Sequence, residues 1–190
     1  MRELEEYGDV WAIDRASAIQ WAKNLLSGSF LLLDTETTGL NTNTSEIVQI
    51  SVVCNHGASL LDTLVKPSGL IPKEATAIHH ITNEMVQSAP TWQEVFPKLL
   101  TILKHQRIII YNANYDWPLI ASVTKRAGLD MLPIIGNVVE CAMLKYSAYI
   151  GELGKYGAYR WQKLTGGDHT AKGDCLATLE LIKRMSESGV

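Results

Sequence analysis

Short apolar runs open the folded part of the chain. Phe30-Leu31-Leu32-Leu33 is continuously apolar, which is typical of a strand buried on both faces, although a buried helix segment has the same pattern. Residues 47–53 are rich in β-branched side chains, Asn55-His56-Gly57 forms a turn, and residues 60–65 form a return strand. The three apolar segments therefore predict an antiparallel meander.

In the rest of the chain, segments with apolar residues at helical spacing alternate with short segments that have the composition of strands. Residues 107–111 and, more weakly, 134–139 have the composition of strands. Helices are predicted at 17–26, 74–80, 91–104, 117–127, 141–150, 159–164 and 171–185. This order predicts a mixed α/β sheet with three antiparallel strands followed by parallel strands, and with helices on both faces. We expect residues 1–29 to form an arm and a helix packed on one domain at 30–190.

The composition is that of a globular chain, since apolar residues make up 46% and charged residues 19%. No apolar run approaches the roughly 20 residues that cross a bilayer, and the acidic N-terminus does not resemble a signal peptide. Cys54, Cys141 and Cys175 are widely spaced, which favours reduced thiols. We therefore expect a cytoplasmic protein without a membrane partner.

The net charge of −3 neither supports nor excludes nucleic acid. The acidic excess lies in residues 1–46, whereas the last third is slightly basic. A phosphate-attracting surface would draw on Lys155, Arg160, Lys163 and Lys172, which are otherwise ordinary solvated side chains. Metal ions held by carboxylates would add positive charge that the composition does not count.

Acidic residues stand at the ends of predicted elements. Asp34 and Glu36 follow the first strand directly, and residues at i and i+2 of an extended chain point to one side. Asp116 follows the 107–111 strand, and Asp174 lies in the first turns of the last helix, five residues after His169. Since such sheets form sites beyond the carboxyl ends of their strands, we expect these groups to meet.

Two carboxylates held close together repel each other unless a proton or a cation lies between them. Mg²⁺ prefers oxygen ligands, often one or two carboxylates plus substrate phosphates. Each residue also has a plainer interpretation. Asp34 and Glu36 alone are compatible with solvated acids, Asp116 with a helix N-cap and His169 with a surface histidine.

Three motifs together resemble those of the DEDDh (DnaQ-like) 3′–5′ exonucleases, a group that includes the proofreading subunit of bacterial DNA polymerase III. They are DTETTGL at 34–40, YNANYD at 111–116 and HTAKGD at 169–174, and AIHHIT at 77–82 is similar to a further family segment. The tyrosine subclass would have Tyr at position 170, where this chain has Thr170, so the histidine subclass fits better. The resemblance implies an RNase H-like fold.

The resemblance also implies a two-metal mechanism with Mg²⁺ or Mn²⁺. Asp34 would bridge the two ions, Glu36 and Asp174 would complete the ligands of the first ion, and Asp116 would bind the second ion. His169 would be the general base, which suits an imidazole with an ordinary pKa of about 6.5.

Substrate contacts are implied at six positions. Thr37 and Leu40 match residues that hold the 3′-terminal nucleotide, and Ile78 and His79 match residues that pack on its base or sugar. Asn112 and Tyr115 match residues beside the scissile phosphate. His79 and Tyr115 are equally compatible with core positions.

Two segments depart from the family pattern. Val139-Glu140-Cys141 stands where relatives often have an Asp, and the role of Glu140 is open. Residues 149–167 do not match the family closely.

The function expected is a 3′–5′ exonuclease that releases nucleoside 5′-monophosphates, mainly from single-stranded DNA. One alternative is the same chemistry on RNA or short oligoribonucleotides. Another is a trimming subunit of a DNA-processing complex, with Trp11 or residues 149–167 as the partner face. A binding module without catalysis is a third, although all five catalytic-type residues are present.

Overall fold

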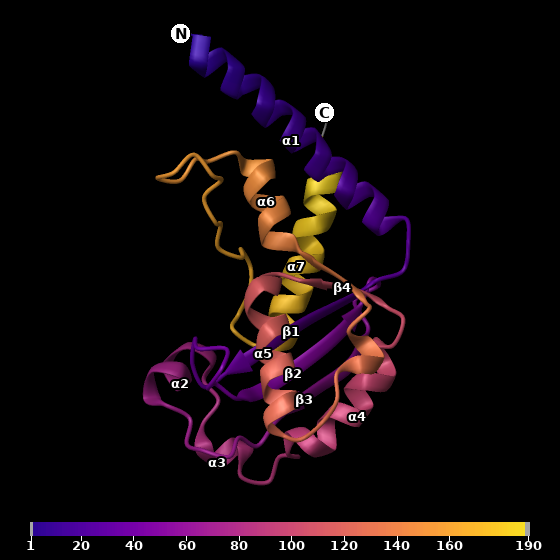
Figure 1. Cartoon of the computed structure of the whole chain (residues 1–190), viewed down its shortest axis with the longest axis vertical. Helices are drawn as coiled ribbons and strands as arrows, with labels where there is room; N and C mark the ends of the chain where they lie inside the picture. Colours follow the sequence, from indigo (N-terminus) through magenta and orange to yellow (C-terminus); the bar gives the residue numbers. More distant parts are fainter. Residues whose placement is uncertain (1, 189–190) are drawn as a thin grey trace.

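The computed structural model describes the backbone of residues 2–188 and the side chains of residues 10–188. The predicted regions 1–29 and 30–190 include residues 1 and 189–190, which lie outside the described residues. A five-stranded sheet in the order β3-β2-β1-β4-β5 forms the centre of the structure (Figure 1). The strands β1, β2 and β3 pair antiparallel, and β4 and β5 run parallel to β1. This confirms the predicted mixed sheet. The strands are β1 (Leu31–Thr37), β2 (Ile47–Cys54), β3 (Ser59–Leu64), β4 (Arg107–Ile110) and β5 (Val138–Cys141).

Seven α-helices and one 3₁₀ turn surround the sheet within the described residues. They are α1 (Arg2–Leu26), α2 (Lys73–His79), α3 (Asn83–Val86), α4 (Trp92–Leu103), α5 (Ala113–Arg126), η1 (Leu132–Ile134), α6 (Ala142–Ile150) and α7 (Ala171–Glu187). None of these helices is both long enough and apolar enough to serve as a membrane span.

The structure corrects three predicted elements. The first helix begins at Arg2 instead of residue 17, and β5 begins at Val138 because the chain first makes the η1 turn. Residues 159–164 are not helical. Leu153 and Tyr159 instead form an antiparallel bridge, and the Gly154 amide donates to the Ala158 carbonyl, so the local backbone bonds are those of a hairpin.

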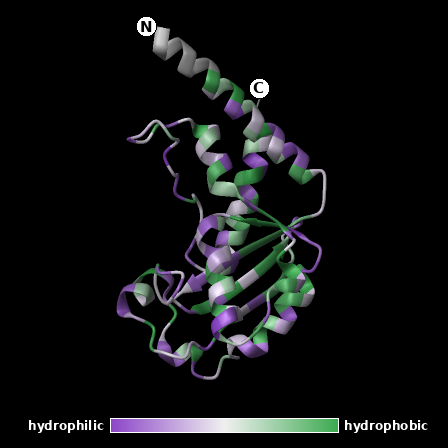
Figure 2. Ribbon diagram, viewed as in Figure 1, coloured by the Kyte–Doolittle hydropathy of each residue, from purple (hydrophilic) through white to green (hydrophobic). Residues whose placement is uncertain are grey.

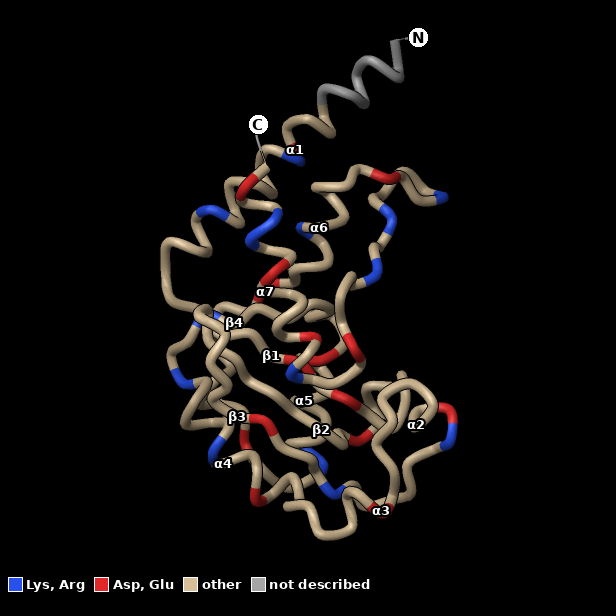
Figure 3. The backbone as a smooth tube through the Cα atoms, turned by 180° about the vertical axis from the view of Figure 1, so that it is seen from behind, with Lys and Arg blue, Asp and Glu red and all other residues tan. Residues whose placement is uncertain are grey.

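The two faces of β1 pack against different helices. Leu31 and Leu33 belong to a core with α4 and α5, whereas Leu32 belongs to a core with α1, α6 and α7. Figure 2 shows the strands as predominantly hydrophobic between these layers. Because burial of both faces fixes the strand register, the residues that continue β1 are also directed to opposite faces. Figure 3 shows acidic segments gathered around the labels of β1 and α5.

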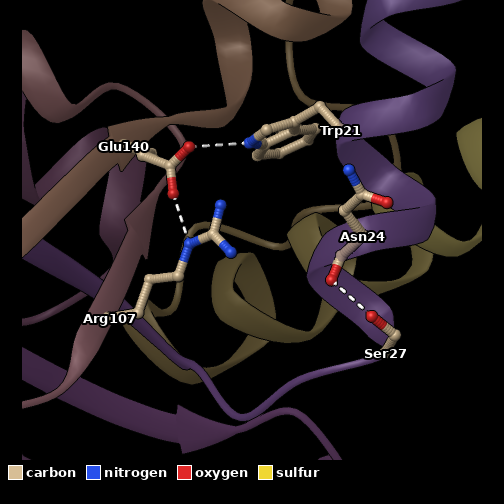
Figure 4. Close-up of polar contacts among 5 residues, drawn as sticks. All are labelled: Trp21, Asn24, Ser27, Arg107 and Glu140. Atoms are coloured by element: carbon tan, nitrogen blue, oxygen red, sulfur yellow. Dashed lines mark hydrogen bonds and ion pairs between the residues drawn. The ribbon is translucent and has the colours of Figure 1, made fainter.

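Glu140 fastens the N-terminal helix to the sheet. Its Oε1 accepts a hydrogen bond of 2.8 Å from Trp21 Nε1 of α1, and its Oε2 accepts one of 2.5 Å from Arg107 Nε of β4 (Figure 4). Burial raises the pKa of Glu140, but the bonds from Arg107 and Trp21 outweigh it and leave the pKa below the ordinary value. The role left open by the sequence is therefore structural: Glu140 joins α1, β4 and β5.

Candidate active site

Three carboxylates converge at the second half of the central strand, which extends through Thr37 and so includes both acids of the first motif. Asp34 and Glu36 lie on the face of β1 that packs on α7, and Asp174 comes from the first turn of α7. One ligand oxygen from each of the three lies within 4.8 Å of the others. The predicted meeting of these acids across distant parts of the sequence is therefore found in the structure.

Asp116 approaches the cluster from the other face of the sheet. It lies in the first turn of α5 and is only 4% exposed. Thr35 points toward α5, and its Oγ1 donates a 2.6 Å hydrogen bond to Asp116 Oδ1. The helix begins at Ala113 with Asn112 as its N-cap, so the interpretation of Asp116 as an N-cap is wrong.

The cluster is electrostatically strained without a cation. Burial, and then the like charges of Asp116, Asp174 and Glu36, raise the pKa of Asp34 well above its ordinary value. Burial and the neighbouring carboxylates also raise the pKa of Glu36 to about 8. Burial raises the pKa of Asp116 to about 7, although the Thr35 hydroxyl opposes it. A set of hard oxygen donors in this state fits a hard divalent cation.

Asp174 is also tied to the loop that carries His169. The amides of Asp168 and His169 donate to Asp174 Oδ1 at 3.1 and 3.3 Å. Burial raises the pKa of Asp174, and the bond from the His169 amide partly offsets this rise. The His169 side chain is exposed, and its backbone has φ 59°, in the left-handed region. The loop thus places an imidazole next to the cluster without packing it.

Asp168 shapes this loop. Its Oδ1 accepts bonds from the Thr170 amide at 3.0 Å and from Thr170 Oγ1 at 2.7 Å, so the contact spans His169. Thr170 Oγ1 in turn accepts from the Gly173 amide at 3.0 Å as the N-cap of α7. A Cβ on Gly173 would collide with Asp168 Oδ1, so a larger residue at position 173 would push that carboxylate away from its bonds to Thr170.

The predicted substrate residues lie on two sides of the end of β1. Thr37 Oγ1 and the Tyr115 hydroxyl are 2.8 Å apart, and Tyr115 also donates to the Gly39 carbonyl. Leu40 and Ile78 are 89% and 55% exposed. Tyr115 therefore joins both the end of β1, through Thr37, and the turn after it, through Gly39, to α5.

His79 and Asn112 are set deeper. His79 is 5% exposed, and its Nδ1 accepts a 3.0 Å hydrogen bond from the Ile81 amide. Burial lowers its pKa, although the nearby Thr37 carbonyl acts in the opposite direction. His79 Nε2 and Asn112 Oδ1 are buried and have no hydrogen-bond partner among the described residues. Both atoms are shielded from solvent, and the imidazole faces the Thr37 carbonyl, so His79 is packed against the end of β1.

Sequence reasoning missed Thr35, Gly167 and Asp168. Thr35 stands between the two acids of the first motif, so its side chain points to the opposite face of the strand. That position could have indicated Thr35 as a hydrogen-bond donor to Asp116. A Cβ on Gly167 would collide with the Asp174 carboxylate. Gly167, just before the third motif, and Gly173, within it, could have indicated close packing around its acids.

A mixed sheet of this order, with acids gathered along the second half of its central strand, is an RNase H-like fold. Residues 31–182 match the family model RNase_T, described as Exonuclease, and the chain belongs to this exonuclease family. It is a DnaQ-like nuclease, and exonucleases of this family depend on divalent metal ions.

Two relatives span most of their own length in the match. "Uncharacterized exonuclease CP81" of Escherichia phage 186 is 38% identical over 192 residues, which are 94% of this chain and 98% of the phage protein. "DNA polymerase III subunit epsilon" of Aquifex aeolicus is 30% identical over 181 residues, or 90% of this chain and 86% of that subunit. "DNA polymerase III PolC-type" of Thermotoga maritima is 29% identical, but the match covers only 12% of that protein.

The fold is also found in solved structures. Escherichia coli exonuclease I in complex with a dT13 oligonucleotide superposes with a TM-score of 0.69 over 84% of this chain and 41% of that one. The sequence identity is 16%, so this likeness concerns the fold.

Proposed function

We propose that this protein is a 3′–5′ exonuclease that hydrolyses the terminal phosphodiester of single-stranded DNA and releases nucleoside 5′-monophosphates. The convergence of Asp34, Glu36 and Asp174 within 4.8 Å, next to the His169 loop, carries the proposal. The names of the polymerase III relatives and the DNA complex of exonuclease I support DNA as the substrate.

The carboxylates suit the role of metal ligands. We assign Asp34, Glu36 and Asp174 to one Mg²⁺ or Mn²⁺ ion, and Asp34 with Asp116 to a second. Such a pair of ions, when bound, would stabilise the attacking and the leaving oxygen of the phosphodiester. Thr35 would hold the Asp116 carboxylate in place through its 2.6 Å hydrogen bond.

His169 suits the role of general base. It would take a proton from the attacking water, and its exposed position lets the ring turn toward the phosphate when substrate arrives. Asp174 would hold the loop through the His169 amide, so the ligand and the base would be positioned together.

The 3′ end of the DNA would bind next to the end of β1 and the turn that follows it. Thr37 and Leu40 would hold the 3′-terminal nucleotide, and Ile78 and His79 would pack on its base or sugar. Asn112 and Tyr115 would lie beside the scissile phosphate. Apolar packing on a base is tolerant of sequence, as an exonuclease requires.

RNA is the competing substrate. A protein distinguishes RNA from DNA by its contacts to the 2′-hydroxyl, and here those contacts would lie near Glu36 and Leu40. A place in a DNA-processing assembly is a further proposal, since two of the relatives above are named for DNA polymerase III.

The test uses 5′-labelled single-stranded DNA and RNA of one sequence, with Mg²⁺ or Mn²⁺. We expect a ladder that shortens from the 3′ end, faster on DNA, and we expect Asp34→Ala to lose both this activity and metal binding measured by calorimetry. His169→Ala should keep metal binding and lose at least about a hundredfold in single-turnover rate, because general-base catalysis typically contributes that much. His56→Ala, on the exposed β2–β3 turn, is the matched control. A fully active His169→Ala enzyme would contradict the proposed base, and internal cleavage would contradict the proposed reaction.

A further inference from the structure

Residues 153–163, here called the strap, carry exposed aromatic and basic side chains in alternation. Tyr156 and Trp161 are 88% and 63% exposed. Lys155, Arg160 and Lys163 are also exposed, and no acidic residue lies between Glu152 and Asp168. The exonuclease site described above uses none of these side chains.

The strap is folded and anchored at its outer end. Leu153 and Tyr159 form a bridge, and the Gly154 amide donates to the Ala158 carbonyl at 2.7 Å. The Tyr159 hydroxyl donates to Asp14 Oδ2 of α1 at 2.7 Å. These bonds turn one aromatic ring of the strap inward, toward α1, while Tyr156 and Trp161 remain exposed.

The inner end of the strap borders the acidic cluster. The Tyr111 hydroxyl donates a 2.8 Å hydrogen bond to the Gln162 carbonyl, and Tyr111 directly precedes Asn112 at the end of β4. A few residues further on, Gly167 lies against the Asp174 carboxylate. Figure 3 shows the basic positions following one another along this segment toward the acidic centre. Trp161 and Lys163 therefore lie on a path that leads to the His169 loop.

The cations of the strap are not neutralised within the described part of the chain. Lys155, Arg160 and Lys163 make no ion pair there, and Lys155 Nζ lies 5.5 Å from the centroid of the Tyr156 ring. The neighbouring Glu152 carboxylate accepts a 3.2 Å bond from Gln162 Nε2 instead. Exposed rings flanked by unpaired cations match a chain that offers both flat bases and phosphates.

We propose that the strap binds the nucleotides of a single strand that lie upstream of its 3′-terminal nucleotide. Trp161 and Tyr156 stack on bases, and Lys155, Arg160 and Lys163 contact phosphates. This inference rests on the proposed exonuclease function and adds to it a dependence on strand length. The surface fits single-stranded nucleic acid better than a protein partner, because cations interrupt its apolar side chains and run toward the site where a phosphodiester is expected.

The test compares a long single strand with a dinucleotide, which has only one nucleotide upstream of its 3′-terminal nucleotide and so offers the strap the fewest contacts. For Trp161→Ala we expect KM on the long strand to rise about tenfold, a loss within the range of one stacked base, with kcat unchanged. On the dinucleotide both constants should stay much closer to their wild-type values. Equal effects on both lengths, or none on either, would overturn the proposal.

Salt dependence separates the two kinds of contact. We measure binding of the labelled long strand by anisotropy in EDTA, where no cleavage occurs. The double variant Arg160→Ala/Lys163→Ala should flatten the plot of log K against log salt by roughly 0.7 per lost phosphate contact, whereas Trp161→Ala should weaken binding without changing the slope. Lys98→Ala, on exposed α4 surface, is the matched control.

These measurements keep the two proposals apart. A wild-type protein that binds the strand through the strap but shortens neither substrate contradicts the exonuclease proposal and supports the strap. Cleavage of both substrates with unchanged binding in every strap variant would support the exonuclease proposal and contradict the strap proposal. The strap would then be a candidate surface for a protein partner.

Discussion

At the scale of residues, the site is a set of acids whose neighbours make ionisation unfavourable. The pKa of Glu36 is raised to about 8 and that of Asp116 to about 7, both first by burial. The folded protein therefore binds more protons than the unfolded chain between the ordinary carboxylate pKa and these values. Protons and metal ions compete for the same oxygens, so the metal affinity should rise with pH across this interval.

We predict that the metal-free protein loses stability as pH rises. Glu36 has an ordinary pKa of 4.5 and a folded pKa of about 8, so its contribution to folding is most favourable below pH 4.5 and declines as pH increases to about 8. The melting temperature in EDTA should fall across this interval, and Mg²⁺ should restore it most at the alkaline end.

Glu36→Gln, which cannot ionise, should flatten that decline, and Glu187→Gln in the last turn of α7 serves as the control. A metal-free melting temperature that rises steadily from pH 5 to 8 would contradict the crowded-carboxylate account.

At the scale of elements, β1 serves the site from both of its faces. Asp34 and Glu36 are directed to the α7 side, and Thr35 and Thr37 to the α5 side, where they bond to Asp116 and Tyr115. One extended segment thus positions groups from two helices. A shift of one residue in its register would exchange the two sets, and burial of the preceding leucines prevents that shift.

Thr35→Val tests this arrangement, because it keeps the β-branched shape and removes the hydroxyl donor. Loss of a hydrogen bond to a charged group should cost about 1.5–3 kcal/mol of unfolding free energy. The pKa of Asp116 should also rise further, so activity at neutral pH should fall and recover partly at higher pH. Thr35→Ser, which retains the hydroxyl, should stay close to wild type. Equal behaviour of the two variants in denaturant unfolding and in pH–rate profiles would argue against the bond.

At the scale of the whole molecule, α1 is part of the fold and also extends beyond it. Ile19, Ala22 and Leu25 are at most 1% exposed, and Trp21 is bonded to Glu140. Figure 1 shows the N-terminal turns of α1 projecting away from the other elements. We propose that residues 30–190 hold the catalytic groups and that the second half of α1 covers one face of their core.

Truncation should separate the two parts of α1. Deleting residues 1–9 should leave the melting temperature and the exonuclease rate nearly unchanged, whereas deleting residues 1–29 should expose the core beneath α1 and prevent stable folding. Calorimetry and far-UV circular dichroism measure both outcomes. Trp21→Phe is an intermediate case that loses one hydrogen bond but keeps the apolar ring, and it should fold with reduced stability. A stable 30–190 fragment would show that α1 is dispensable.

The sequence by itself determined the sheet and the acids of the site, because both depend on local patterns. Apolar runs such as Phe30–Leu33 define strands, and the alternation of an extended chain placed Asp34 and Glu36 on one side. Motif spacing predicted Asp116, Asp174 and His169 as further members of the site. Only the tertiary structure decided what depends on contacts between distant residues: the bond from Thr35 to Asp116, the role of Glu140 and the anchoring of Gln162 on Tyr111. Residues 159–164 have helical spacing, yet residues 159–163 fold as part of the strap. The Arg160 amide donates to the Glu152 carbonyl, and the Gln162 carbonyl accepts from the Tyr111 hydroxyl, in place of the backbone bonds that a helix would make.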